Sequence, residues 1–168
     1  MKKLFLLLIC PLFFGCDDGD LQIETLDFNS IVTVQTCNTV SITTQNTLFK
    51  LNDNQALIID LAANVLKNEE GVIEVEITDS TDTTLIYRIF SDAATSNYFC
   101  DDIPPITPTV IDEIVASKGT LKITTVLSDT TEGSFEHTIE IIDITLDTSQ
   151  GQRITDLTID EFGTITTS

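Results

Sequence analysis

The sequence predicts an all-β fold, an antiparallel β-sandwich of immunoglobulin-like type, with a small β-barrel as the alternative. Ile, Thr and Val together supply 58 of the 168 residues, and β-branched side chains favour extended backbone. Apolar and polar residues alternate along several short segments, and turn residues separate these segments. A chain of this length is sufficient for one domain with its own hydrophobic core.

Three segments show the period-two alternation of half-buried strands, namely Ile73–Thr78, Leu121–Thr125 and Phe135–Ile141. Directly after the third segment the phase shifts by one residue, because Ile142 and Ile144 continue the apolar set. We expect a β-bulge there, or a strand that passes from one sheet environment to another.

Turn signals define the remaining elements. Asn52-Asp53-Asn54 separates Thr47–Leu51 from Gln55–Leu61, which predicts a hairpin. Asp79–Asp82 leads into a further strand, Leu85–Phe90. Turns containing glycine divide the C-terminal half at Lys118-Gly119, Glu132-Gly133 and Gln150-Gly151.

Three segments do not fit the strand pattern. Ile103–Pro108 contains three prolines and predicts a loop, because proline cannot donate to a strand ladder. Asp60–Lys67 and Ala93–Phe99 could each form one or two helical turns, which are too short to be stable alone.

The N-terminus has the three parts of a secretory signal peptide. Met1-Lys2-Lys3 is cationic, Leu4–Phe14 is apolar, and Gly15 precedes Cys16. The apolar run is shorter than the roughly 20 residues that a membrane-spanning helix needs. We therefore predict that residues 1–15 are removed as a signal peptide.

Phe13-Phe14-Gly15-Cys16 resembles the lipobox of bacterial lipoproteins. In that family the cysteine thiol is diacylated, the signal is cut off before it, and the new N-terminus is usually acylated. The resemblance implies that Cys16 carries the lipid, and two or three acyl chains anchor a protein firmly whereas one does so only marginally. The alternative is an ordinary secreted protein in which Cys16 is a free thiol.

Asp17-Asp18-Gly19-Asp20 follows the cysteine and predicts an acidic tether over residues 16–20, ahead of a single domain over residues 21–168. Acidic residues at this place resemble the surface-export signal of Bacteroidota lipoproteins, and the whole chain resembles lipoproteins of flavobacterial type. The resemblance implies an outer-membrane protein exposed at the cell surface. In enterobacteria an Asp directly after the lipidated cysteine, the position of Asp17 here, instead retains a lipoprotein at the inner membrane, facing the periplasm.

The cysteine count predicts one disulfide. Cys10 leaves with the signal and Cys16 carries lipid, so Cys37 and Cys100 remain as an even pair in an exported protein. In the chain-entropy model such a bond stabilises the fold by about 4 kcal/mol. A zinc site is disfavoured by the single histidine and the missing CxxC pair, and two buried free thiols are the other alternative.

The charge balance excludes two classes of partner. The chain carries 8 Lys+Arg against 27 Asp+Glu, a net charge of -19. Nucleic acids and anionic lipid surfaces are bound by clusters of Lys and Arg. We therefore expect no nucleic-acid partner, and membrane contact through the lipid on Cys16; a protein partner in the cell envelope is left open.

No residue pattern indicates catalysis. His137 is the only histidine and shares a strand face with Phe135 and Ile139. No GxSxG or other nucleophile motif accompanies it, so we expect a partly buried side chain with satisfied hydrogen bonds and not a catalytic base.

Pairs of acidic residues are the other candidates, because two suitably spaced carboxyl groups can hydrolyse a glycosidic bond. The pairs in this chain are Asp101-Asp102, Asp112-Glu113 and Asp160-Glu161, and at this composition such pairs arise by chance. The absence of Trp and the presence of only two Tyr count against carbohydrate recognition by stacking.

Calcium binding is a more reasonable hypothesis than glycosidic hydrolysis, because oxygen ligands in loops suit that ion. The residues concerned are Asn52-Asp53-Asn54, Asp79 with Asp82, and Asp101-Asp102. The EF-hand pattern is absent. Asp and Asn also favour turns, and a high net charge keeps exposed strands of different molecules from pairing; we prefer this explanation of the acidic loops to calcium binding. We therefore assign no catalytic residue, no cofactor and no metal ligand.

Tyr98-Phe99-Cys100 places two aromatic residues beside the expected disulfide. We expect both rings to pack over the bond in the core, whereas exposure would indicate a partner surface. The sequence as a whole predicts a lipid-anchored, non-enzymatic binding or structural module of the cell envelope with an open ligand. A calcium-dependent adhesion or interaction module is the first alternative, and a surface hydrolase is the less favoured one.

Overall fold

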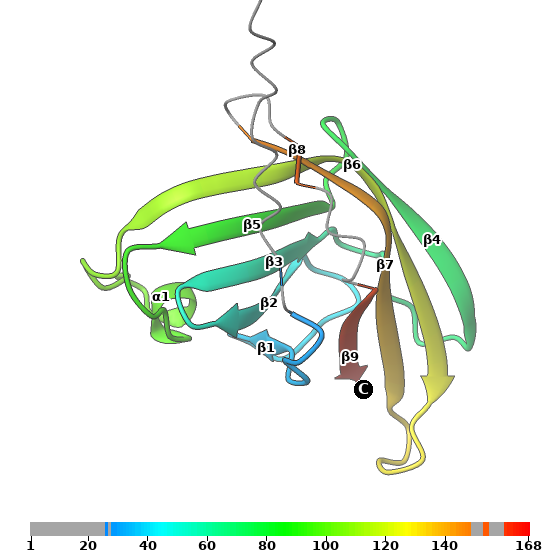
Figure 1. The fold of residues 1–168 in the computed structure, drawn as a ribbon. Helices are drawn as coiled ribbons and strands as arrows, with labels where there is room; N and C mark the ends of the chain where they lie inside the picture. Colours follow the sequence, from blue (N-terminus) through cyan, green and yellow to red (C-terminus); the bar gives the residue numbers. More distant parts are fainter. Residues whose placement is uncertain (1–25, 27, 149–152, 155–159) are drawn as a thin grey trace, which may run out of the picture.

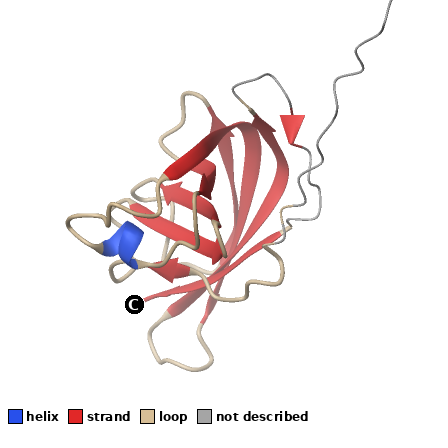
Figure 2. Ribbon diagram, turned by 60° about the vertical axis from the view of Figure 1, so that its left-hand side comes forward, coloured by secondary structure: helices blue, strands red, loops and turns tan. Residues whose placement is uncertain are grey.

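A computed structural model of the chain describes residue 26 and residues 28–148, 153–154 and 160–168. The predicted signal peptide, Cys16, the acidic tether and the Gln150-Gly151 turn lie outside these residues. Nearly all the regular structure is β, as the sequence predicts, and one short helix lies on the outer side of a curled sheet (Figure 2). The elements are β1 (Gln35–Thr36), β2 (Asn46–Asn52), β3 (Gln55–Leu61), β4 (Gly71–Thr78), β5 (Thr84–Phe90), α1 (Asn97–Cys100), β6 (Val110–Leu127), β7 (Phe135–Asp147), β8 (Arg153–Ile154) and β9 (Glu161–Thr167).

The described strands form one antiparallel sheet in the order β1-β2-β3-β5-β6-β7-β8, with β4 also paired to β6 and β9 to β7. β6 has 18 residues and serves both halves of the sheet, because its first part pairs with β5 and its later part with β4. Figure 1 shows the sheet curling at β6, so that β5, β3 and β2 face β4, β7 and β9 across the interior. The expected all-β antiparallel fold is therefore confirmed, with a sandwich-like or barrel-like curl.

β6 and β7 bend together where the two halves meet. The neighbours of Gly119 in β6 pair with Ile142 and Thr145 of β7, so that Asp143 and Ile144 together face one glycine. Asp143 has a left-handed backbone with φ 53°, and a Cβ on Gly119 would lie 3.0 Å from Ile144 Cδ1. The phase shift predicted for this strand is therefore a β-bulge, at the place where the strand passes between the two halves.

The main core lies between the inner faces of the two halves and includes Phe28, Leu48, Leu57, Ile59, Tyr87, Ile114, Leu121, Ile123, Ile139 and Phe162. A second set of buried residues, here named the outer cluster, covers the other face of β2, β3 and β5 and consists of Phe49, Ala56, Ile58, Phe90 and Ala94. Because both faces of this half are covered, the four consecutive residues from Ala56 to Ile59 are all buried instead of alternating.

Most of the predicted strands and turns are found where the sequence places them, but the turn predicted at Lys118-Gly119 is wrong. Both residues lie inside the continuous strand β6, where Gly119 faces the bulge of β7 and does not end a strand. The Asn52–Asn54 turn joins β2 to β3, and Ile73–Thr78 lies in β4. Of the two ambiguous segments, Asp60–Lys67 contains the end of β3 and no helix, whereas the one-turn helix α1 begins inside the other. Ile103–Pro108 is a loop without regular structure.

Lys50 connects the two ends of the curled sheet. Its side chain is only 2% exposed, and its Nζ donates to the carbonyl oxygens of Phe28 at 3.1 Å and of Glu161 in β9 at 3.4 Å. The ammonium group also lies 5.7 Å from the centre of the Phe162 ring. Among the described strands, β2 and β9 are not paired in a ladder. The hydrogen bonds of Lys50 therefore link these two strands.

We expect Lys50→Ala to lower the free energy of unfolding by about 2 kcal/mol, because two carbonyl groups inside the curl lose their charged donor. The matched control is Lys122→Ala, whose ion pair with Glu140 is about one-third exposed to water and should contribute at most about 1 kcal/mol. Denaturant titrations of both variants measure the difference. Equal losses of unfolding free energy for the two variants would contradict the role of Lys50 in linking β2 to β9.

Candidate functional site

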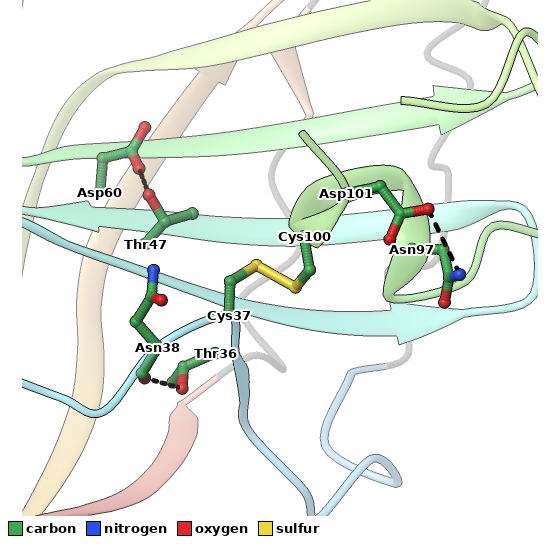
Figure 3. The surroundings of a disulfide bond; sticks show 8 residues. All are labelled: Thr36, Cys37, Asn38, Thr47, Asp60, Asn97, Cys100 and Asp101. Atoms are coloured by element: carbon green, nitrogen blue, oxygen red, sulfur yellow. Dashed lines mark hydrogen bonds between the residues drawn. A yellow bond between two sulfur atoms is a disulfide. The ribbon is translucent and has the colours of Figure 1, made fainter. Parts of the chain in front are cut away.

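The expected disulfide between Cys37 and Cys100 is present in the structure, with 5.0 Å between the two Cα atoms (Figure 3). Cys37 follows β1 directly, and Cys100 is the last residue of α1. The bond therefore ties the N-terminal strand region to the helix across 63 residues of chain. Both cysteines are exposed, so the bond lies at the surface.

A hollow of about 430 Å³ opens beside this disulfide. Its lining comes from the end of β1, from both ends of the loop between β1 and β2, from the start of β2 and from α1, and it consists of Thr36, Cys37, Asn38, Thr39, Thr44, Gln45, Asn46, Thr47 and Phe99. None of these nine residues is charged, and seven carry a hydroxyl or carboxamide group. We refer to this concavity as the disulfide pocket.

Hydrogen bonds hold the walls of the disulfide pocket in place. Asn46 accepts from the Ser41 backbone N–H at 2.8 Å and donates to the carbonyl oxygens of Ser41 at 2.7 Å and Thr44 at 3.0 Å. Thr36 donates to the carbonyl oxygen of Asn38 at 2.6 Å (Figure 3). Thr47 donates to the carboxylate of Asp60 on β3 at 2.6 Å.

Other lining side chains have hydrogen-bonding groups to spare. Within the described residues, the side chains of Asn38, Thr39, Thr44 and Gln45 make no hydrogen bond. These four groups lie on walls that the bonds of their neighbours hold in position. The disulfide pocket therefore combines fixed walls with side chains that can donate to and accept from a ligand.

The two aromatic residues before Cys100 pack on the outer cluster and are half-buried. Phe99 stacks on Phe49 with ring centres 4.4 Å apart, and Tyr98 meets Phe90 edge to face at 4.8 Å. The Arg88 guanidinium lies 5.8 Å from the centre of the Phe99 ring. The expectation that both rings pack over the disulfide in the core is met only in part, because the rings are half-buried against the outer cluster and do not enter the main core.

His137 is fully buried, and both ring nitrogens are hydrogen bonded to threonines. Nδ1 lies 2.9 Å from the Thr125 hydroxyl and Nε2 lies 2.8 Å from the Thr167 hydroxyl. Because Thr167 donates its proton to Asn68 at 2.6 Å, it accepts from Nε2, and we assign the neutral tautomer with the proton on Nε2. Burial lowers the pKa of His137 below its ordinary value, as expected for a cation removed from water.

The acidic residues lie apart or are engaged elsewhere. Glu113 pairs with Arg88, and Asp101 accepts from the Asn97 amide at 3.4 Å. In the described part of the chain, no three carboxylate, histidine or cysteine side chains lie close enough together to hold a metal ion. The Asn54 amide instead donates to the carbonyl oxygen of Phe90 at 3.2 Å, which is a turn-ordering contact.

Sequence reasoning missed two features of the site region. Lys50 interrupts the apolar run Leu48–Leu51 in phase with the inner face, which was a signal for a buried cation. It lines a hollow of about 310 Å³ together with Asp160 and Glu161. Burial lowers the pKa of Lys50, and the charge of Glu161 opposes that shift.

The disulfide pocket is the second missed feature. Its sequence signal is the stretch from Phe28 to Phe49, which contains no charged residue in an otherwise acidic chain.

Comparison of the chain with protein-family models, with curated protein sequences and with solved structures gave no significant match in any of the three. Over the described residues, no helix has the length and apolar character needed to cross a bilayer.

We expect the stability to fall on mild acidification because of His137. The pKa of this group is lowered in the folded state, so below about pH 6.5 the unfolded chain binds a proton that the folded chain does not. The free energy of unfolding should therefore decrease from about pH 7 to about pH 5, by at most about 1.4 kcal/mol per pH unit. Denaturant titrations at several pH values measure the slope. His137→Gln should flatten it, and a slope that survives this substitution would assign the effect to other groups.

We expect the double variant Cys37→Ser/Cys100→Ser to lose about 4 kcal/mol of unfolding free energy, because the unfolded chain is no longer constrained by the long loop. Denaturation of the wild type with and without a reducing agent provides the internal control, since reduction should produce the same loss. A difference below about 1 kcal/mol would mean that packing alone holds α1 on the outer cluster.

Proposed function

We propose that the protein is a lipid-anchored module of the cell envelope that binds a ligand and catalyses no reaction. The observation that carries the proposal is the segment Phe13-Phe14-Gly15-Cys16, which resembles a lipobox and follows a short apolar signal. The anchor must come from lipid, because the chain as a whole has a net charge of -19, and a body left more acidic still by the loss of Lys2 and Lys3 is repelled by anionic headgroups. The location that we propose is the outer membrane, with the domain at the cell surface.

The disulfide supports an exported location independently of the N-terminal segment. Cys37 and Cys100 are exposed and joined, and such bonds persist in oxidising compartments whereas cytosolic reductants remove them. A signal peptide and a surface disulfide therefore agree on the compartment. This agreement uses two separate parts of the sequence, one outside and one inside the described domain.

The disulfide pocket supports a binding role. In this concavity, side chains with unused hydrogen-bonding groups lie beside an aromatic ring. His137, the strongest sequence candidate for acid–base chemistry, is buried and bonded to two threonines. The contacts in the pocket suit recognition by hydrogen bonding more than bond cleavage, which needs convergent acid, base or nucleophile groups.

Metabolic labelling with an alkyne fatty acid in the native host tests the anchor. We expect label on the wild type and none on Cys16→Ala, because the thiol that receives the lipid is gone. The matched control is Cys10→Ala, which removes a cysteine inside the predicted signal and should leave the label unchanged. An unlabelled wild type, or equal label on Cys16→Ala, would refute the proposal.

Protease treatment of intact cells then separates the possible locations of the labelled protein. Digestion by added protease is the result expected for a domain at the cell surface. Protection in intact cells combined with recovery in the inner-membrane fraction would keep the lipid anchor and overturn the outer-membrane location.

A further inference from the structure

The disulfide pocket is neutral in a strongly acidic protein. The lining residues carry no charge, although the chain has 27 Asp+Glu residues. Most of the wall comes from the charge-free stretch between Phe28 and Phe49. A charged ligand would find no opposite charge on this wall, so the lining favours a ligand that is itself neutral.

Two carboxylates in the surroundings of the disulfide are hydrogen bonded to neighbouring polar groups. Asp60 accepts from the Thr47 hydroxyl at 2.6 Å, and Asp101 accepts from the Asn97 amide at 3.4 Å (Figure 3). The Thr47–Asp60 bond also orients the threonine on the pocket wall. These contacts leave recognition to hydroxyl and carboxamide groups.

The available groups match ligand hydroxyls in kind. The carboxamides of Asn38 and Gln45 and the hydroxyls of Thr39 and Thr44 can each donate and accept, and none of these side chains is hydrogen bonded within the described residues. A ligand hydroxyl also donates and accepts. Several such groups on one ligand would therefore be satisfied by several neighbouring side chains without any ion pair.

Phe99 adds an apolar element to the same lining. Its ring is fixed by the stack on Phe49 at 4.4 Å and by an edge contact with Phe90 at 6.2 Å. A ring held in this way offers C–H and π surface to the apolar face of a ligand. The pocket volume of about 430 Å³ falls within the range of roughly 300–1,000 Å³ that small-molecule sites occupy.

We propose that the disulfide pocket binds a neutral polyhydroxylated ligand, namely one or two units of an uncharged saccharide. The inference rests on the proposed binding function and specifies its ligand class. Recognition relies on the hydroxyl and carboxamide lining, with Phe99 as a minor apolar contact. This mode agrees with the lack of Trp in the chain, which argued only against recognition by stacking.

The disulfide has a defined part in this site. Cys37 belongs to the wall that carries Asn38 and Thr39, and Cys100 follows Phe99 directly. The bond therefore fixes the distance between the polar wall and the aromatic ring. A site whose walls are fixed in advance loses less conformational entropy when a ligand binds.

Calorimetric titration of the mature full-length protein in detergent tests the inference. The probes are four neutral oligosaccharides, maltohexaose, mannohexaose, xylohexaose and laminarihexaose, with hexagalacturonate as the charged counterpart. We expect at least one neutral probe to bind with a Kd below about 1 mM. The double variant Asn38→Ala/Gln45→Ala should weaken this binding by about tenfold or more, and the charged probe should not bind.

The matched control is Gln55→Ala, which removes a carboxamide at the start of β3 that does not line the pocket and should leave the Kd unchanged. Circular dichroism of each variant shows that the fold is kept. Absence of binding to all neutral probes, preference for the charged probe, or unchanged binding in the double variant would overturn the inference. Mass spectrometry of the same preparation reports lipidation, so a lipidated protein without saccharide binding refutes the ligand class and leaves the anchor intact.

Discussion

The bend shared by β6 and β7 is the constraint on which the rest of the structure depends. A strand of 18 residues would extend a flat sheet far beyond the core that it has to cover. The bulge at Asp143 and Ile144, seated against the bare backbone of Gly119, turns both strands at the same point. One continuous sheet can then enclose its own hydrophobic interior, and Lys50 connects the two ends that the curl brings together.

The curl also creates a problem that the helix and the disulfide solve. Phe49, Ile58 and Phe90 face outward from β2, β3 and β5 and would be exposed without a cover. α1 has four residues and no side-chain cap, which is too short for a helix to persist on its own. The covalent bond to Cys37 holds it against the outer cluster. The pocket beside the bond is therefore a consequence of covering this second apolar face.

The local features were predictable from sequence, and the long-range ones were not. The hairpin turn at Asn52–Asn54 and the bulge in β7 follow from turn chemistry and period-two phase, which neighbouring residues determine. The first part of β6 was missed because Asp112 and Glu113 interrupt its alternation. The turn predicted at Lys118-Gly119 was wrong because this glycine accommodates the close approach of Ile144 within a continuous strand. The burial of both faces of β3, and of Lys50 against Phe28 and Glu161, depends on contacts between residues far apart in the chain. Cys37 and Cys100 were predictable as a pair by elimination, but the pocket that they complete was not, because Phe99 reaches it only through the fold.

The distribution of charge gives the surface two different properties. Acidic side chains on most of the chain keep exposed strands from pairing with those of other molecules. The uncharged stretch before Lys50 departs from this pattern and contributes most of the wall of the hollow beside the disulfide. A neutral patch has no long-range attraction for a ligand, so its affinity has to come from short contacts in a fixed geometry. Fixing the wall is what Asn46, Thr36 and the disulfide accomplish, and their cooperation on so small a region is the strongest reason to regard it as a recognition surface.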